Sequence, residues 1–114
     1  DGQNVFEKFP QAQFYDYTKG FKRMEKYLNG KMPKNYHLTF SRSESNDKHA
    51  RLVLAMGGNV AVVFRNHLPK QWEKRNVIDG DESDLRFKDP HGVVIGLVEK
   101  GAAKKDESGF VVNP

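Results

Sequence analysis

Residues 59–64, with the sequence NVAVVF, are apolar at nearly every position, and no other segment limits the fold as strongly. A strand with one face in water alternates apolar and polar residues, whereas a strand covered on both faces is apolar throughout. Strands of the second kind lie in the interior of parallel sheets. Residues 59–64 therefore predict a buried central strand of a parallel sheet.

The segments around this strand alternate between strand and helix patterns. Aromatic and β-branched residues favour strands over 12–18, 36–41 and 92–98. Apolar residues recur at helical spacing within 21–28 and 47–56, and glycine follows shortly after each of these two segments. The order predicts an α/β fold with alternating strand-helix units and a mainly parallel sheet, either half-barrel-like or a small open three-layer sheet.

The remaining segments carry weaker patterns. The stretch after the central strand is irregular and charged, with short strand-like pieces at 77–78 and 85–87. Polar residues over 104–109 predict a turn, and 110–112 either add an edge strand or trail off.

Length and composition narrow the class of protein. The 114 residues predict a single α/β domain over 1–114, and a start at Asp1 rather than Met leaves open that the chain is a fragment of a longer protein. Without cysteine the chain alone forms no disulfide, thiolate metal site or iron–sulfur cluster, which fits a cytoplasmic location. No apolar run approaches the roughly 20 residues of a membrane span. The net charge of +4 favours the approach of polyanions, so weak nucleic-acid binding is one alternative.

Five segments carry a family resemblance: 14–19 (FYDYTK), 36–43 (YHLTFSRS), 59–64 (NVAVVF), 78–87 (IDGDESDLRF) and 92–97 (GVVIGL). They resemble successive strands of uncharacterised phage and prophage proteins, and the likeness extends over most of the chain. Longer members of that group resemble barrel proteins distantly related to radical-SAM enzymes, with a cysteine cluster in their N-terminal half.

The resemblance implies that this chain matches the C-terminal half of such a barrel. Because the chain has no cysteine, none of the cluster chemistry carries over. A half-barrel leaves sheet edges exposed. The resemblance therefore implies self-association, a separate partner chain or a rearranged open sheet.

Polar residues follow several predicted strands at the point where each strand ends. Ligands of parallel α/β folds bind at these carboxyl ends. The predicted ligand-binding residues are Asp16, Thr18, Lys19, Ser41, Arg42, Ser43, Arg65 and Lys100. Guanidinium, ammonium and hydroxyl donors suit phosphate or carboxylate oxygens, so the sequence predicts an anion-binding face. The alternative is that these residues are solvated loop starts.

The sequence predicts no metal and no cofactor. Asp79, Asp81 and Asp84 stand at short spacing, and carboxylate oxygens suit magnesium or calcium, but the Asp-Gly pair favours a simple acidic turn. No two of the four histidines stand at metal-ligand spacing. His37 lies within a strand pattern and is predicted to pack in the interior.

Three functions stay open, and the pattern does not decide whether the chain is an enzyme. The favoured one is a binding or accessory module with an anion-friendly face at the strand ends. The second is a small enzyme that acts on a phosphate- or carboxylate-bearing substrate. The third is a basic nucleic-acid-binding module, with Trp72 as the aromatic residue expected to be exposed. Scattered rather than clustered basic residues count against the third.

Overall fold

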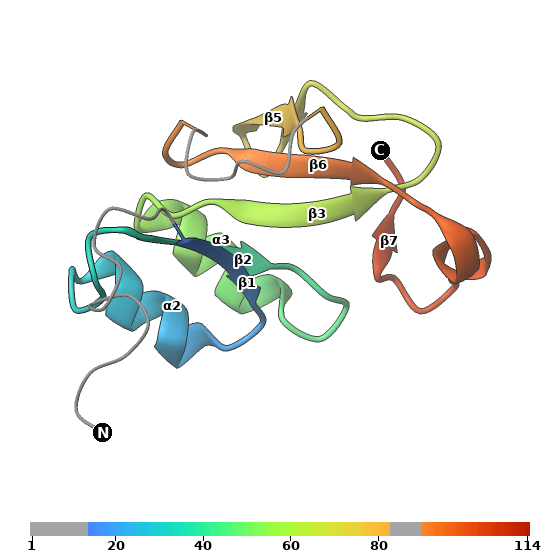
Figure 1. Ribbon diagram of the computed structural model, residues 1–114. Coiled ribbons are helices and arrows are strands. Elements are labelled where there is room, and N and C mark those ends of the chain that lie inside the picture. The colour runs from blue at the N-terminus through green and yellow to red at the C-terminus, as the bar shows by residue number, and fades with distance from the viewer. Residues whose placement is uncertain (1–13, 83–89) are drawn as a thin grey trace.

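The computed structural model describes residues 14–82 and 90–114. The predicted piece at 85–87 lies outside these ranges. The elements are strands β1 (Phe14–Thr18), β2 (Tyr36–Ser41), β3 (Val60–Phe64), β4 (Gln71–Trp72), β5 (Arg75–Asp79), β6 (Val94–Val98) and β7 (Val111–Val112), helices α2 (Phe21–Leu28) and α3 (Asp47–Ala55), and the 3-10 helix η2 (Gly101–Lys105) (Figure 1).

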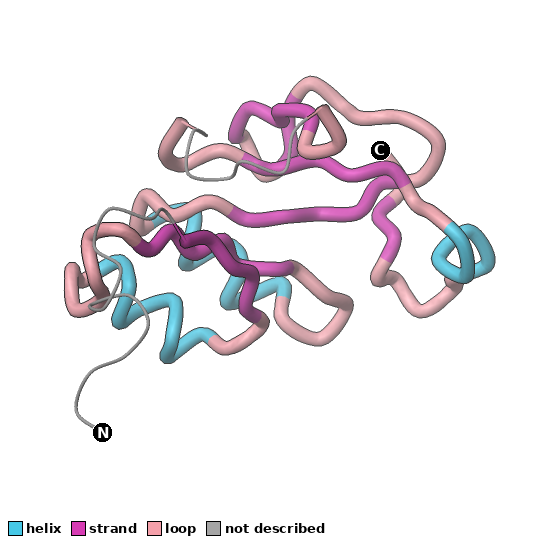
Figure 2. The backbone as a smooth tube through the Cα atoms, in the orientation of Figure 1, coloured by secondary structure: helices cyan, strands magenta, loops and turns pink. Residues whose placement is uncertain are grey.

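The strands form one open seven-stranded sheet in the order β1-β2-β3-β6-β5-β4, with β7 paired to β3. Neighbouring strands are parallel except for β4 and β5, which are antiparallel. Figure 2 shows β3 and β6 side by side at the centre of the sheet. The predicted α/β class, the alternation of strands and helices and the mainly parallel sheet are confirmed. The run at 59–64 is β3, and Val60, Val62 and Phe64 are fully buried.

Helices α2 and α3 cover the same face of the sheet (Figure 1). The chain moves in one direction across the sheet from β1 to β2 to β3, and right-handed crossovers in one direction place their helices on one face. Met24 from α2 and Val53 from α3 accordingly share a core with Phe40 of β2. Within the described ranges these two helices form a single layer on the open sheet.

The core lies between this helix layer and the sheet. Its largest fully buried side chains include Phe40, Phe64, Met24, Leu38 and Ile95. Trp72 was expected to be exposed, but it is partly buried and packs against this core, because the short β4–β5 hairpin folds back beside β6.

Gly96 of β6 permits close packing beside that hairpin. A Cβ atom at this position would lie 2.6 Å from Cγ1 of Val77 and 2.9 Å from Cδ2 of Leu68. Both distances are too short for carbon atoms in contact, so any larger residue at position 96 would push the neighbouring side chains apart.

Strands β2 and β7 share one edge of β3. Strand β2 pairs only with the start of β3, through Phe40 opposite Val60 and Ser41 opposite Ala61. Farther along, β7 pairs with Val63 and Phe64, while β6 pairs along the whole of the other edge of β3. The C-terminal segment thus occupies the place beside β3 that β2 leaves, and it is a strand rather than a trailing end.

Candidate functional site

The carboxyl ends of β1, β2, β3 and β6 lie at one edge of the sheet, because these strands are parallel neighbours. This edge and the segment 99–114 that follows β6 form the candidate site. All eight predicted ligand-binding residues lie in or directly after these four strands. Their hydrogen bonds decide which of them are free to meet a ligand.

Arg42, directly after β2, is buried and nearly saturated with hydrogen bonds. Its Nε and Nη2 atoms donate to the two carboxylate oxygens of Asp47, at 2.6 and 3.2 Å. Its Nη1 atom donates to the carbonyl oxygens of Gly109, at 2.6 Å, and Phe110, at 2.9 Å. A guanidinium carries five N–H donors, so four of these are already used. Arg42 therefore joins β2, the first turn of α3 and the entry to β7.

The short polar residues at the strand ends shape local turns. The Thr18 hydroxyl accepts a hydrogen bond from the Gly20 amide at 3.0 Å. Asn46 links the other two, because its side chain donates to the Ser41 carbonyl at 3.1 Å and accepts from the Ser43 amide at 2.7 Å. These contacts fix the chain where it leaves β1 and β2.

The first charged residue of the predicted set, Asp16, also has partners nearby. Its Oδ1 atom accepts a hydrogen bond from the Tyr17 amide at 2.8 Å, and its Oδ2 atom lies 3.6 Å from Nη2 of Arg23. More than half of its side chain is exposed, so the carboxylate faces solvent on the edge strand.

Two cations of the predicted set have aromatic or acidic partners. The ammonium group of Lys19 lies 5.4 Å from the centre of the Phe110 ring, where a cation–π contact is favourable. Lys100 donates to a carboxylate oxygen of Asp81 at 2.6 Å. Both interactions tie the rim of the site together.

Arg65, directly after β3, holds the C-terminal segment against the sheet. Its two terminal nitrogens donate to the carbonyl oxygens of Lys104, at 3.0 Å, and Asp106, at 2.6 Å. Its backbone amide donates to the Val112 carbonyl at 2.9 Å. Arg65 thus fixes η2 and β7 relative to the end of β3.

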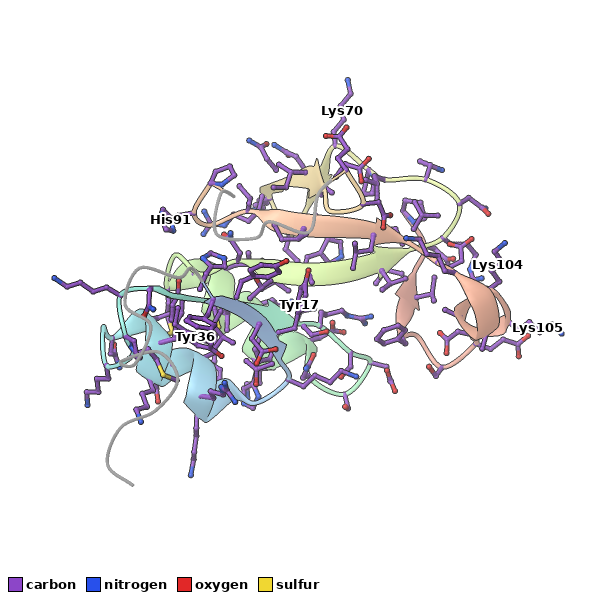
Figure 3. The ribbon with its side chains drawn as sticks, viewed as in Figure 1. Tyr17, Tyr36, Lys70, His91, Lys104 and Lys105 are labelled. Carbon is purple, nitrogen blue, oxygen red and sulfur yellow. The ribbon has the colours of Figure 1, made fainter. Side chains whose placement is uncertain are left out.

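A pocket of about 420 Å³ lies between these elements. It is lined by Arg65, Lys104, Lys105, Asp106, Glu107, Gly109, Val111 and Asn113. Lys104 and Lys105 are exposed, and within 14–82 and 90–114 neither ammonium group forms an ion pair or a side-chain hydrogen bond. Figure 3 shows both side chains on η2, at one end of the molecule.

Asp106 organises the loop that closes this pocket. Its carboxylate accepts hydrogen bonds from the Ser108 hydroxyl at 2.6 Å and from the Val111 amide at 3.0 Å. The bond from Ser108 and those from backbone amides hold the pKa of Asp106 below its ordinary value. This carboxylate is therefore ionised at neutral pH, and its negative charge offsets part of the positive charge that the lysines bring to the pocket.

The structure keeps the predicted edge but places different cations in its pocket. Of the predicted set only Arg65 lines it, and the sequence reading had interpreted Lys104 and Lys105 as part of a polar turn. Two consecutive lysines after the strand at 92–98 were the one sequence feature that pointed to this part of the site. Their place beside the end of β3 follows from the pairing of β7 with β3, which the sequence did not predict.

The remaining candidates from the sequence have structural partners. His37 is buried, and its Nδ1 atom lies 3.3 Å from the Tyr27 hydroxyl. Asp79 accepts a hydrogen bond from the Asp81 amide at 2.9 Å, as an acidic turn requires, and Asp84 lies outside the described ranges. In the part of the chain that the structure describes, no group of three or more histidine or acidic residues is placed to hold a metal ion.

Comparison with known families identifies the relatives of this chain. A family model described as gene product 88 matches residues 2–114. The chain belongs to the gene product 88 family. This membership agrees with the expected likeness to phage-type proteins, whereas the further likeness to radical-SAM barrels is not shown by it. No curated protein and no solved structure matches the chain significantly.

The length and apolar character of the helices were compared with those of a membrane span. Among the residues that the structure describes, none of the helices combines the length and the apolar character that a bilayer span requires.

Proposed function

We propose that this gene product 88 domain is a binding or accessory module that holds an anion in the pocket between β3, η2 and β7. The observation that carries the proposal is that the exposed ammonium groups of Lys104 and Lys105 form no ion pair with any described residue and lie beside a pocket of about 420 Å³. Pockets for small ligands have volumes from roughly 300 Å³ upward. The ligand is a phosphate-bearing or carboxylate-bearing group small enough to enter this space.

The arrangement assigns different tasks to the cations. Lys104 and Lys105 supply mobile positive charges that a ligand oxygen can approach, as lysine does at phosphate sites. Arg65 supports them, because it binds the backbone carbonyl of Lys104 and leaves that side chain outside the contact. A substitution of the lysine side chains therefore removes the charges and keeps the carbonyl that Arg65 needs.

Titration of the ¹⁵N-labelled domain with inorganic phosphate and with pyrophosphate tests this site. At low salt we expect saturable shifts of the Lys104, Lys105 and Gly109 amides. The double variant Lys104→Gln/Lys105→Gln should weaken binding about tenfold, because two partly screened ion pairs contribute roughly 0.7 kcal/mol each.

The matched control is Lys22→Gln/Lys26→Gln on α2. This pair is also exposed and lies outside the pocket, and its replacement gives the same net charge. The control should bind phosphate as the unchanged domain does. An equal loss in both double variants would reduce the effect to net charge and would overturn the proposed site, as would a titration without saturable shifts.

The sequence also led to expectations about the location of the protein, its partners and nucleic-acid binding. A cytoplasmic setting rests on the cysteine-free sequence alone. Self-association or a separate partner chain and weak nucleic-acid binding remain predictions. A linear, non-saturable response to phosphate together with tight binding of single-stranded DNA would favour the nucleic-acid alternative.

A further inference from the structure

A second pocket lies at the opposite end of the strands. It has a volume of about 440 Å³ and is lined by Tyr27, Leu28, Gly30, Met32, Pro33, Lys34, Tyr36 and His91. Figure 3 shows Tyr36 and His91 at the end of the molecule away from Lys104 and Lys105. The two pockets share none of the described residues that line them, so this site is separate from the one at the strand ends.

Two tyrosine rings form the fixed walls of this pocket. Tyr36 is 4% exposed, and its hydroxyl accepts a hydrogen bond from Nη2 of Arg23 at 2.5 Å. The Tyr27 ring meets the Tyr36 ring edge to face, with 6.3 Å between ring centres. The Tyr27 hydroxyl lies 3.3 Å from Nδ1 of His37, and burial raises the pKa of this hydroxyl, so it stays neutral. Walls held in this way need little reordering when a ligand binds.

The remaining walls are apolar and follow the loop between α2 and β2. Leu28, Met32 and Pro33 line this side, and Leu28 and Met32 also pack against the buried core. Flat apolar groups bind well between aromatic rings and a methionine, because ring faces and sulfur both offer polarisable surface. The body of a fitting ligand is therefore a flat aromatic ring system.

The polar rim of the pocket is basic. Lys34 and His91 are exposed, and neither forms an ion pair with any residue in the described ranges. Among the described residues that line the pocket there is no aspartate or glutamate. An anionic group at the mouth would therefore meet the positive side chain of Lys34.

From these features we infer that this pocket binds a small aromatic acid. The ring system lies against Tyr27, Tyr36 and Met32, and the anionic group faces Lys34 at the mouth. The inference does not depend on phosphate binding at the strand ends, because the two pockets have different walls and different cations.

The test compares two probes of nearly equal shape, 2-naphthoate and the neutral 2-naphthalenemethanol, on the ¹⁵N-labelled domain. We expect 2-naphthoate to cause saturable shifts of the Gly30, Met32, Lys34 and His91 amides. The neutral alcohol should shift the same amides with about threefold weaker affinity, because it lacks the partly screened attraction to the rim.

Two variants of the same loop separate the site charge from general charge. Lys34→Gln should weaken 2-naphthoate binding about threefold and leave the alcohol unchanged. Lys31→Gln removes a lysine that is also exposed but does not line the pocket, and it should change neither probe. The inference is wrong if no saturable shift occurs by ~5 mM probe, a concentration that corresponds to only about 3 kcal/mol of binding free energy. Equal binding of both probes, or equal effects of the two variants, also overturns it.

Discussion

Arg42→Ala should destabilise the domain strongly, although the sequence alone suggested a role in ligand binding. The substitution removes two hydrogen bonds to carbonyl oxygens and a bidentate pair with Asp47. Hydrogen bonds from a charged donor contribute roughly 1.5–3 kcal/mol each, and removal of one partner of a buried pair costs roughly 3–5 kcal/mol. The Asp47 side chain is 37% exposed and regains water, so we expect a net loss of about 3 kcal/mol in the free energy of unfolding.

Urea unfolding measures this loss directly. With a slope of about 2 kcal/mol per molar urea, the transition midpoint should fall by about 1.5 M without a change in slope. The matched control is Arg51→Ala, since Arg51 is 56% exposed and forms a surface pair with Glu73 at 3.3 Å. That variant should lose less than about 1 kcal/mol.

The position of the loss can be checked as well. Arg42 fixes the entry to β7, so in Arg42→Ala the Arg65 amide, which donates to the Val112 carbonyl, should exchange its hydrogen faster. Arg42→Lys keeps the charge without the planar fork and should recover only part of the stability. If Arg42→Ala and Arg51→Ala shift the midpoint equally, Arg42 does not anchor β7 and the reasoning is refuted.

Two further substitutions test the pair of Arg42 with Asp47 and the packing beside β6. The hydrogen bonds from Arg42 lower the pKa of Asp47 in the folded protein, so its ionised form stabilises the fold above its ordinary pKa of about 3.9 and loses that effect as the pH falls through the folded value. Asp47→Asn should therefore unfold at lower urea than the unchanged domain at pH 6, with the gap closing toward pH 2; a constant gap contradicts this. Gly96→Ala should cost about 1–3 kcal/mol in urea unfolding because of the short contacts beside β6. Gly20→Ala, where a Cβ has no contact under 3.4 Å, should cost less than about 1 kcal/mol, and equal losses would contradict the overpacking.

The regular elements were predictable because local patterns determine them. Apolar spacing gave the helix at 21–28 with its observed bounds, and alternation gave the strand at 36–41. The continuous apolar run at 59–64 was a sound sign of the central strand, since β3 has β6 on one edge and β2 and β7 on the other. Short elements escaped prediction, because η2 and β4 have too few residues to show a period.

The contacts of the residues at the sheet edge were less predictable than their position there. Polarity directly after a strand shows that a residue lies at the sheet edge, but it does not show what its side chain meets. Arg42 and Gly109 are 67 positions apart, and no local pattern reports a hydrogen bond over that separation. The sequence could therefore not distinguish an arginine that binds a ligand from one that binds the protein's own backbone.

Both strand-end arginines bind carbonyl groups of the same C-terminal segment. Arg42 holds Gly109 and Phe110, and Arg65 holds Lys104 and Asp106. Strand β7 pairs with β3 through only two residues, so strand pairing does not satisfy these carbonyl groups. The two arginines supply the missing hydrogen-bond donors. This C-terminal segment contains Lys104 and Lys105, and it places them at the sheet edge where the arginines were expected to bind a ligand. The positive charge predicted for this edge is thus divided between arginines that hold the C-terminal segment and lysines whose side chains are exposed.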